Sequence, residues 1–531
     1  MKDYPEIKRF LEKQDEEIIN LRKSSGKAYF DAITSGEEGL YKDYEKKALE
    51  EEKYFHNKEN FEKVKEFLKK VKEPLEKRQL TILYLAYLGA QGNFELTKRI
   101  LEISTKVEQI FNNYRAKVGG KEISDNELKD ILKNETDSKK LKEAWEANKK
   151  QGAIVEKDVI LLVKLRNELA KGLGYENYFK MSLELNEQDE EEIDKIFLTL
   201  NERTERTFER LKKELDEAIS KKCGIEIHEL KPWHYQDPFF QEAPEIYKFD
   251  FNDFYKEDII KKAIAFYDNI GFDTRDILEK SDLYEKPKKY QHACCIDIDK
   301  QGDVRIVQNT KNNEKWMDTT LHELGHAVYD KYYDKRLPFL LRGSAHIFVT
   351  ESIALLFGRN SKNSTFIERY CGIEKEKIKD ISESAMKQLQ MRQIIFLRWC
   401  QVMYNFEKEF YKNPEQNLNK LWWELVKKFQ KIDFSRDSPD WASKIHLASS
   451  PVYYQNYLLG ELLASQLQNH IFKEILKQKE VKNSDYSKKE AGEYLKKNIF
   501  EQGRKYSWNE LIEKATGEKL TPKYFLEDFC D

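Results

Sequence analysis

Chain breakers are scarce along this sequence, since only 11 prolines and 21 glycines interrupt its 531 residues. Proline removes a backbone donor and glycine raises the entropic cost of ordering the chain, so both residues mark turns and element ends. A chain with so few of them favours long helices over many short strands joined by tight turns. We therefore predict a mainly α fold, and the length suffices for one large or two smaller domains.

Apolar residues recur at helical spacing along the first 115 residues, which form an N-terminal helical region. The clearest series is Phe61, Val64, Phe67, Leu68 and Val71. The Lys/Glu runs between such residues are expected to be solvated helix faces. A break at Val118-Gly119-Gly120 separates this region from a second helical series.

The clearest strand signal lies at residues 292–298 and 304–307. Asp299-Lys300-Gln301-Gly302 lies between them and has the composition of a turn. The segment from Pro232 to Pro238 is an irregular, aromatic loop. We therefore predict a single short β-hairpin within a helical protein.

The charge balance argues against nucleic acid and anionic membranes as partners, because 93 basic residues meet 96 acidic ones for a net charge of −3. The N-terminus opens with charges and lacks the apolar core of a secretory signal. The longest apolar stretch, residues 82–90, is too short to span a bilayer. The six cysteines have no spacing typical of a disulfide framework, so we expect a reduced, cytoplasmic protein.

The strongest chemical signal is His-Glu-Leu-Gly-His at residues 322–326. On a helix, positions i and i+4 share one face, so His322 and His326 can reach the same zinc ion. Glu323 is then placed to act as a base toward the attacking water without being a ligand. The alternative is a pair of ordinary surface or core histidines, but the flanking segment is proline-free and helix-compatible.

A zinc hydrolase needs a third protein ligand, and Glu351 is the best candidate. It lies 25 residues after His326 within the apolar segment 347–355. Burying a carboxylate in so apolar a helix costs free energy unless the carboxylate is paired or bound to metal. The alternative interpretation is that Glu351 is an exposed glutamate. Asp318, one turn before His322, is placed to accept a hydrogen bond from a ligand imidazole. We expect one Zn²⁺ per chain.

A second group of polar and aromatic residues follows in segment 444–457. It contains Lys444, His446, Tyr454 and Tyr457. Taken singly, a tyrosine pair at helical spacing is usually core, a lone histidine structural and a lone lysine solvated. Peptide hydrolysis nevertheless needs hydrogen-bond donors for the oxyanion besides the metal, and this segment offers them.

Together with the zinc helix, this segment resembles the angiotensin-converting-enzyme family of gluzincin peptidases, the peptidyl-dipeptidase A group. That family carries a Lys-x-His element followed by two tyrosines three residues apart. The resemblance implies that Lys444 and Tyr454 bind the substrate's C-terminal carboxylate. It likewise implies that His446 and Tyr457 stabilise the transition state.

Further segments extend the resemblance to about residues 125–460. Three of them are similar to the family's helices before the cleft: Ala144-Trp145-Glu146, Arg166-Asn167-Glu168-Leu169-Ala170 and Gly174-Tyr175-Glu176-Asn177-Tyr178. The run from His292 to Asp297 is similar to the edge strand that pairs with bound peptide in the family, where His292 and Ala293 would contact substrate. The family's carboxylate-binding glutamine corresponds to Gln236, after Trp233. The resemblance implies an ellipsoidal, two-lobed helical molecule with a deep central channel and the hairpin near the zinc. We expect residues 1–531 to form one catalytic domain, with residues 1–115 as a helical lid.

The sequence also departs from that family. The third-ligand spacing of 25 and the run of tyrosines from Tyr453 are closer to thimet oligopeptidase and neurolysin. Asn456 stands where an arginine helps bind chloride in the animal enzymes, which argues against chloride activation. Leu355 stands where the family places an acidic residue near the metal, and Asp318 is expected to take over part of that role.

Three functions remain open at this stage. The first is a monomeric dipeptidyl carboxypeptidase acting on short peptides, and the second is an endo-acting oligopeptidase of the thimet type. Lys444 discriminates between them, because a fixed positive charge selects a free C-terminal carboxylate. The third is a non-catalytic peptide-binding protein with a structural zinc, against which Glu323 argues because such a site has no need of a base.

Overall fold

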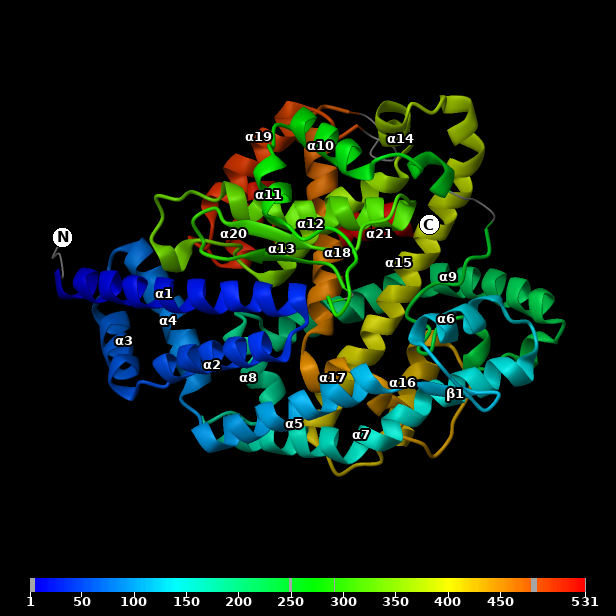
Figure 1. Cartoon of the computed structure of the whole chain (residues 1–531), viewed down its shortest axis with the longest axis horizontal. Helices are drawn as coiled ribbons and strands as arrows, with labels where there is room; N and C mark the ends of the chain where they lie inside the picture. Colours follow the sequence, from blue (N-terminus) through cyan, green and yellow to red (C-terminus); the bar gives the residue numbers. More distant parts are fainter. Residues whose placement is uncertain (1–4, 248–250, 291, 479–484, 531) are drawn as a thin grey trace. The chain divides into compact units, whose positions relative to one another are not determined.

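The computed structural model describes residues 5–247, 251–290, 292–478 and 485–530. It is 71% helical, and its strands within these ranges form two small antiparallel two-stranded sheets (Figure 1). The predicted mainly α class is therefore confirmed. No helix in the described ranges is long and apolar enough to cross a membrane.

Local sequence signals explain where the long helices begin and end. Helix α7 (Ser138–Gly172) starts behind Asp137, whose carboxylate accepts hydrogen bonds from the backbone N–H groups of Lys139 and Lys140. Helix α9 (Glu190–Cys223) has three glutamates in its first turn and ends at Gly224, which adopts a left-handed conformation with φ 65°. Gly224 thus lies where the helix ends and the chain turns.

The chain divides into two compact units. Unit 1 comprises Met1–Gln91, Phe249–Glu383 and Leu459–Phe525, and unit 2 comprises Gly92–Lys248, Ser384–Leu458 and Leu526–Asp531. The division falls within three helices, α15 (Lys375–Lys412), α18 (Tyr454–His470) and α21 (Lys523–Phe529). The predicted lid over residues 1–115 and the single catalytic domain stay predictions.

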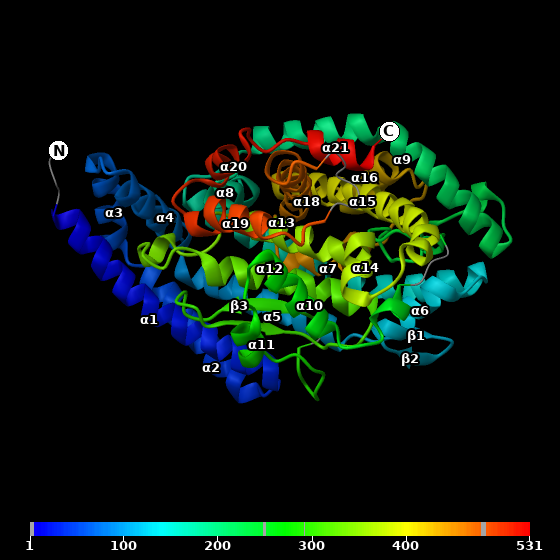
Figure 2. The same cartoon turned by 90° about the horizontal axis from the view of Figure 1, so that it is seen from above.

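Unit 1 contains most of the remaining N-terminal and central elements. Helices α1 and α2 lie side by side, as do α12 and α13 (Figures 1 and 2). Its elements are α1 (Pro5–Ser35), α2 (Glu38–Phe55), α3 (Lys58–Lys70), α4 (Pro74–Ala90), η3 (Asn252–Tyr255), α10 (Ile259–Ile270), α11 (Arg275–Lys280), β3 (Cys294–Asp297), β4 (Val304–Val307), α12 (Glu314–Tyr332), η4 (Phe339–Leu341), α13 (Ile347–Gly358), η5 (Arg359–Lys362), α14 (Ser364–Cys371), η7 (Ile471–Ile475), α19 (Lys489–Asn498), η8 (Phe500–Gln502) and α20 (Trp508–Thr516).

Unit 2 is built around α7, against which α5 and the 3-10 turn η6 pack. Its other elements are α5 (Phe94–Asn113), β1 (Ala116–Val118), β2 (Lys121–Ile123), α6 (Asp125–Asn134), α8 (Tyr178–Leu185), η1 (Ile227–Glu229), η2 (Pro232–His234), α16 (Leu418–Gln430), η6 (Asp440–Ser443) and α17 (His446–Ser449).

The β3–β4 hairpin is the predicted one, although its first strand is shorter than the predicted 292–298. Antiparallel pairing runs from Cys294 opposite Val307 to Asp297 opposite Val304, with the turn at 298–303. The hairpin packs on α12 (Figure 2) and shares a small apolar core with α1, formed by Ile298, Val307, Phe30 and Ile33. The hairpin therefore lies beside the helix that bears the His-Glu-x-x-His motif.

Candidate active site

Helix α12 carries the two histidines of the motif on one face. The helix starts behind Asn313, whose side chain accepts a hydrogen bond from the N–H of Trp316 at 2.9 Å. Its buried face carries apolar residues that include Met317, Leu321, Leu324 and Val328. These contacts fix the rotation of the helix and leave the two motif histidines one turn apart, with ring centroids separated by 5.0 Å.

Helix α13 brings Glu351 to that face because the two helices approach closely at a glycine. A Cβ atom on Gly325 would lie 2.8 Å from the Cα of Ala354, which real contacts do not allow. Glycine inside the motif therefore permits backbone-to-backbone packing of α12 on α13. On its other side Glu351 faces Gly460 of α18, where a Cβ would lie 3.2 Å from the Cγ of Glu351.

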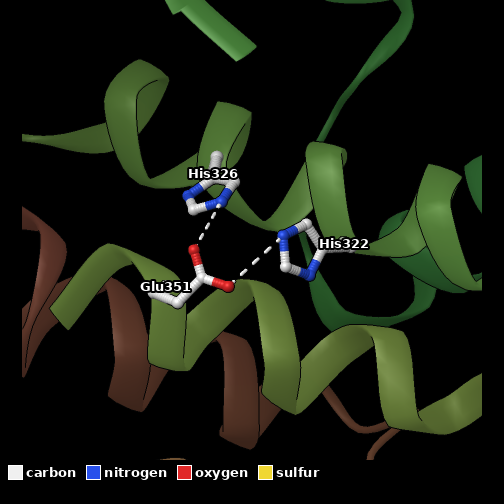
Figure 3. Close-up of side chains that lie close together, drawn as sticks. All are labelled: His322, His326 and Glu351. Carbon is white, nitrogen blue, oxygen red and sulfur yellow. Dashed lines mark ion pairs between the residues drawn. The ribbon is translucent and has the colours of Figure 1, made fainter. Parts of the chain in front are cut away.

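The three predicted ligand side chains converge (Figure 3). The Nε2 atoms of His322 and His326 lie 3.7 Å and 3.6 Å from the two carboxylate oxygens of Glu351. Candidate ligand atoms of the three residues all fall within 4.8 Å of one another. Ligands held about 2.1 Å from a tetrahedral zinc ion are separated by about 3.4 Å, so these residues fit such an ion.

Thr350 orients one of these imidazoles, a role that the sequence analysis did not assign. The Nδ1 of His326 lies 2.8 Å from the Thr350 hydroxyl oxygen. Ligation through Nε2 requires the proton on Nδ1, which then donates to Thr350. The signal in the sequence is a hydroxyl residue directly before the ligand in an otherwise apolar helix. The contact fixes both the tautomer and the plane of the ring.

Burial and neighbouring charges shift the ionisation of this group. Burial lowers the pKa of His322, but the carboxylates of Glu351, Glu323 and Asp318 together raise it above its usual value. Burial and the neighbouring His322 hold the pKa of His326 well below its usual range. Burial raises the pKa of Glu323, which is only 6% exposed, to about 7. A surplus of carboxylates around two imidazoles favours a bound cation.

A further carboxylate near the ligands comes from an unexpected helix. Glu461 of α18 forms an ion pair with Arg359 at 2.5 Å. Burial raises the pKa of Glu351 and lowers that of His322, and the charge of Glu461 is a further influence that raises both. Asp318 ion-pairs with Lys362 at 3.5 Å, so its predicted hydrogen bond to an imidazole stays a prediction. Two carboxylates, on Asp318 of α12 and Glu461 of α18, therefore act electrostatically on His322.

The Thr350 contact gives a testable consequence. A Thr350→Val variant keeps the side-chain shape and loses the acceptor for His326 Nδ1–H. We expect its zinc affinity to fall by roughly 10–100-fold, the scale for loss of a partner that orients a metal ligand. Competition with a chromogenic chelator measures the change. Ser352→Ala is the matched control on the same helix, since its hydroxyl donates only to the Val349 carbonyl. Equal affinity in Thr350→Val and wild type would contradict the role.

The predicted peptide-binding residues of the hairpin lie just before its first strand. His292 is exposed and its ring is tilted against that of Tyr290, with centroids 5.3 Å apart, and Ala293 is half-buried. Burial raises the pKa of Cys294 in β3, and the charge of the Glu323 carboxylate raises it further. The hairpin is therefore close enough to α12 for the charge of Glu323 to act on it. The contact of His292 and Ala293 with substrate stays a prediction.

The second predicted group gathers within unit 2. The imidazole centroid of His446 lies 5.0 Å from the ring of Tyr454 and 6.5 Å from that of Tyr457. The two tyrosine rings are 5.5 Å apart, and the Nζ of Lys444 lies 5.5 Å from the Tyr454 centroid. Four residues predicted to act on substrate are therefore neighbours, while their placement toward the zinc ligands of unit 1 stays a prediction.

Lys444 is buried among aromatic rings. Its Nζ lies 5.1 Å from the centroid of Phe239 and 5.3 Å from that of Trp399. Burial lowers the pKa of Lys444 to about 8, against the opposing charge of Asp237. The segment before it rests on α7 at Gly152, where a Cβ would meet the Pro439 carbonyl oxygen at 2.4 Å. This close backbone contact fixes the segment that precedes Lys444.

A glutamine that the sequence analysis did not select contacts this lysine. The Nζ of Lys444 donates to Oε1 of Gln241 at 2.6 Å. Gln236, the predicted residue, lies five positions earlier in the same loop with a left-handed backbone of φ 62°. In an irregular loop the spacing of residues does not predict where their side chains point. Sequence alone therefore does not distinguish these two glutamines. The role of Gln236 stays a prediction.

His446 is neutral over the physiological range. Burial, followed by the charge of Lys444, lowers its pKa to about 3. Its Nδ1 is a buried atom without a hydrogen-bond partner. A neutral imidazole can donate one N–H to a developing negative charge.

The fold and the site together define a class. A helical chain whose His-Glu-x-x-His helix packs on a second helix with a facing glutamate has the arrangement of the gluzincins, zinc metallopeptidases with a glutamate ligand. Within that class, the chain belongs to the angiotensin-converting enzyme family, peptidase family M2, which it matches over residues 1–529. Members of this family are zinc enzymes.

Individual relatives are distant. The chain is 25% identical to thermostable carboxypeptidase 1 of Pyrococcus furiosus over 247 residues, or 42% of this chain and 49% of that protein. It is 23% identical to carboxypeptidase 1 of Bacillus subtilis over 257 residues, or 43% and 50%. It is 26% identical to angiotensin-converting enzyme of Haematobia irritans exigua over 272 residues, or 48% and 43%. The chain thus spans about half the length of these relatives.

Proposed function

We propose that this chain is a zinc-dependent peptidase that releases dipeptides from the C-termini of short peptides. One zinc ion would be held by His322, His326 and Glu351, and Glu323 would be the general base. The observation that supports this most directly is the convergence of both Nε2 atoms on the Glu351 carboxylate, at 3.6 and 3.7 Å. The names of the relatives, carboxypeptidase and angiotensin-converting enzyme, agree with this class of reaction.

The chemistry is divided between the two groups of residues. A zinc ion held by His322, His326 and Glu351 would supply Lewis acidity and make the attacking water more acidic. Glu323 takes the proton of the attacking water and later delivers it to the leaving amine. The neutral imidazole of His446 and the hydroxyl of Tyr457 donate hydrogen bonds to the oxyanion of the tetrahedral transition state.

Lys444 is the proposed determinant of which end of the peptide is recognised. A buried ammonium surrounded by aromatic rings has little water to solvate it, so a carboxylate is strongly preferred as its partner. Gln241, already hydrogen-bonded to Lys444, and Tyr454, beside it, are placed to add donors to the same carboxylate. A carboxylate bound there would belong to the C-terminal residue of the dipeptide that is released.

The test compares matched peptides with free and amidated C-termini. Wild type should prefer the free acid by about 2–4 kcal/mol in kcat/KM, or roughly 30- to 1,000-fold, because an amide leaves the buried ammonium unpaired. Lys444→Met should abolish most of this preference. The preference should also decline as the pH rises through about 8, where Lys444 loses its proton.

Lys212→Met is the matched control for this substitution. Lys212 is also buried in unit 2, but its Nζ donates to Asp216 and to Tyr235, at 2.6 and 2.8 Å, and it has no proposed part in binding. The control should retain the acid-over-amide preference. Equal wild-type rates on both peptides would reject the dipeptidyl carboxypeptidase and favour the endo-acting oligopeptidase. Absence of hydrolysis by zinc-loaded wild type would favour the non-catalytic peptide-binding protein.

We also propose a cytoplasmic, monomeric enzyme. None of the six cysteines, each of which lies in the described ranges, forms a disulfide. Cysteines outside disulfides are typical of proteins in reducing compartments.

A further inference from the structure

The loop between α17 and α18 carries a strained backbone. Val452 has φ 55°, a left-handed conformation that a β-branched side chain disfavours strongly. The loop separates His446 on α17 from Tyr454 and Tyr457 on α18. Strain of this kind persists only where surrounding contacts hold the backbone, and it is concentrated at functional sites.

A buried carboxylate holds the strained residue. The Oε1 of Glu407, on α15, accepts the backbone N–H of Val452 at 2.9 Å. Glu407 is 2% exposed, and burial raises its pKa to about 7 although this hydrogen bond and the charge of Arg166 oppose the shift. A buried carboxylate is costly, so its use here needs a reason beyond packing.

A buried guanidinium holds the other end of the loop. Arg166, on α7, is 4% exposed and donates to the carbonyl oxygens of Leu447 at 2.8 Å and Ala448 at 2.5 Å. It also donates to the Tyr411 hydroxyl at 3.3 Å and attracts Glu407. The carbonyls before the loop and the N–H within it are therefore held by two opposite charges that attract one another.

Amide side chains extend this support into the first turn of α18. Gln455 Nε2 donates to the Val452 carbonyl at 2.8 Å and to Oε1 of Gln188 at 3.2 Å. Gln188 in turn donates to Oδ1 of Asn456 at 2.7 Å. The loop is thus fixed on both sides of Val452 by buried side chains from α7, α15, α18 and the segment between α8 and α9.

We propose that Glu407 and Arg166 are positioning residues, which hold the strained loop so that His446 and Tyr457 present their donors to one oxyanion. The catalytic meaning of this proposal rests on the proposed function. The backbone restraint itself can be measured without any substrate.

The first experiment measures hydrogen–deuterium exchange of peptides covering residues 447–457 in wild type, Glu407→Ala and Glu407→Gln. Glu407→Ala should accelerate exchange at the Val452 amide by about 10-fold or more, because the N–H loses its only acceptor in the loop. Glu407→Gln keeps an acceptor oxygen in the same place and should retain most of the protection. Unchanged exchange in Glu407→Ala would overturn the proposed restraint.

The second experiment measures peptide hydrolysis by the same variants, at matched zinc content. Glu407→Ala should lower kcat by roughly 10- to 100-fold with KM changed less than about 3-fold, since misplaced transition-state donors affect kcat. Glu407→Gln should recover most of the loss. A loosened loop with unchanged kcat would overturn the positioning role.

Asp194→Ala is the matched control for both experiments. Asp194 accepts from the Tyr404 hydroxyl at 2.9 Å and pairs with Lys408 at 2.5 Å, so its loss also removes a carboxylate contact of α15. It should change neither loop exchange nor kcat. If wild type hydrolyses no peptide, the proposed function fails, whereas the exchange experiment still decides the restraint on the loop.

Discussion

A Glu323→Gln variant is expected to keep its fold and its zinc and to lose kcat by about 10²–10⁴-fold. The amide fits the space of the carboxylate but cannot accept the proton of the attacking water. Glu323 is 6% exposed, so bulk water has little access with which to replace the missing base. Because the ligand set is unchanged, this variant separates the proton transfer from metal binding.

The measurement is kcat on a free-acid peptide at equal zinc content. The control is Glu314→Gln, which makes the same chemical change at the start of α12, where the carboxylate pairs with Lys362 at 2.8 Å. The control should leave kcat close to that of wild type. Wild-type kcat in Glu323→Gln would reject the base assignment, and loss of zinc would show that the residue also supports the metal.

The helical class was predictable because it depends on local signals. Few glycines and prolines, regular apolar spacing and capping side chains act within a turn or two of the chain. The same reasoning missed the β1–β2 sheet around the Val118-Gly119-Gly120 break. Gly119 and Gly120 have φ values of 58° and 75°, as a tight hairpin turn requires, but strands of three residues are too short for alternation to be visible.

The candidate metal group was predictable where its members share an element or an unusual environment. His322 and His326 are on one helix, and Glu351 is the one charged residue of an apolar helix. Glu461 and Gly460 were not predictable. They reach the neighbourhood of Glu351 from α18, more than 100 residues later, through packing that no local pattern encodes.

Prediction had a third basis, a family resemblance, for the segment that contains Lys444, His446, Tyr454 and Tyr457. The resemblance to a family assigned roles to these residues, and the structure brings their side chains together within unit 2. The supports of the loop, Glu407 and Arg166, come from α15 and α7. Two buried, opposite charges on helices far apart in the sequence have no signature in a single sequence, because their residue types are those of any exposed helix face.

Loss of the third ligand should have the largest effect on the metal. Glu351→Ala removes the group that both Nε2 atoms face, and a two-histidine site would remain. We expect zinc affinity to fall by more than the roughly 10–100-fold that loss of an orienting partner produces, and activity to disappear at limiting zinc. Glu279→Ala, at an exposed position on α11, is the matched control and should retain the metal.

Thermal unfolding supplies a readout that does not depend on activity. A ligand that binds only the folded state stabilises it by RT ln(1 + [L]/Kd), so removing zinc with a chelator should lower the Tm of wild type and of Glu279→Ala. The Tm of Glu351→Ala should instead respond little to the chelator, because at the same free zinc concentration its site is already largely empty. Full zinc affinity together with a chelator-sensitive Tm in Glu351→Ala would show that another residue completes the site. Glu461, whose charge acts on Glu351 and His322, would then be the first residue to replace.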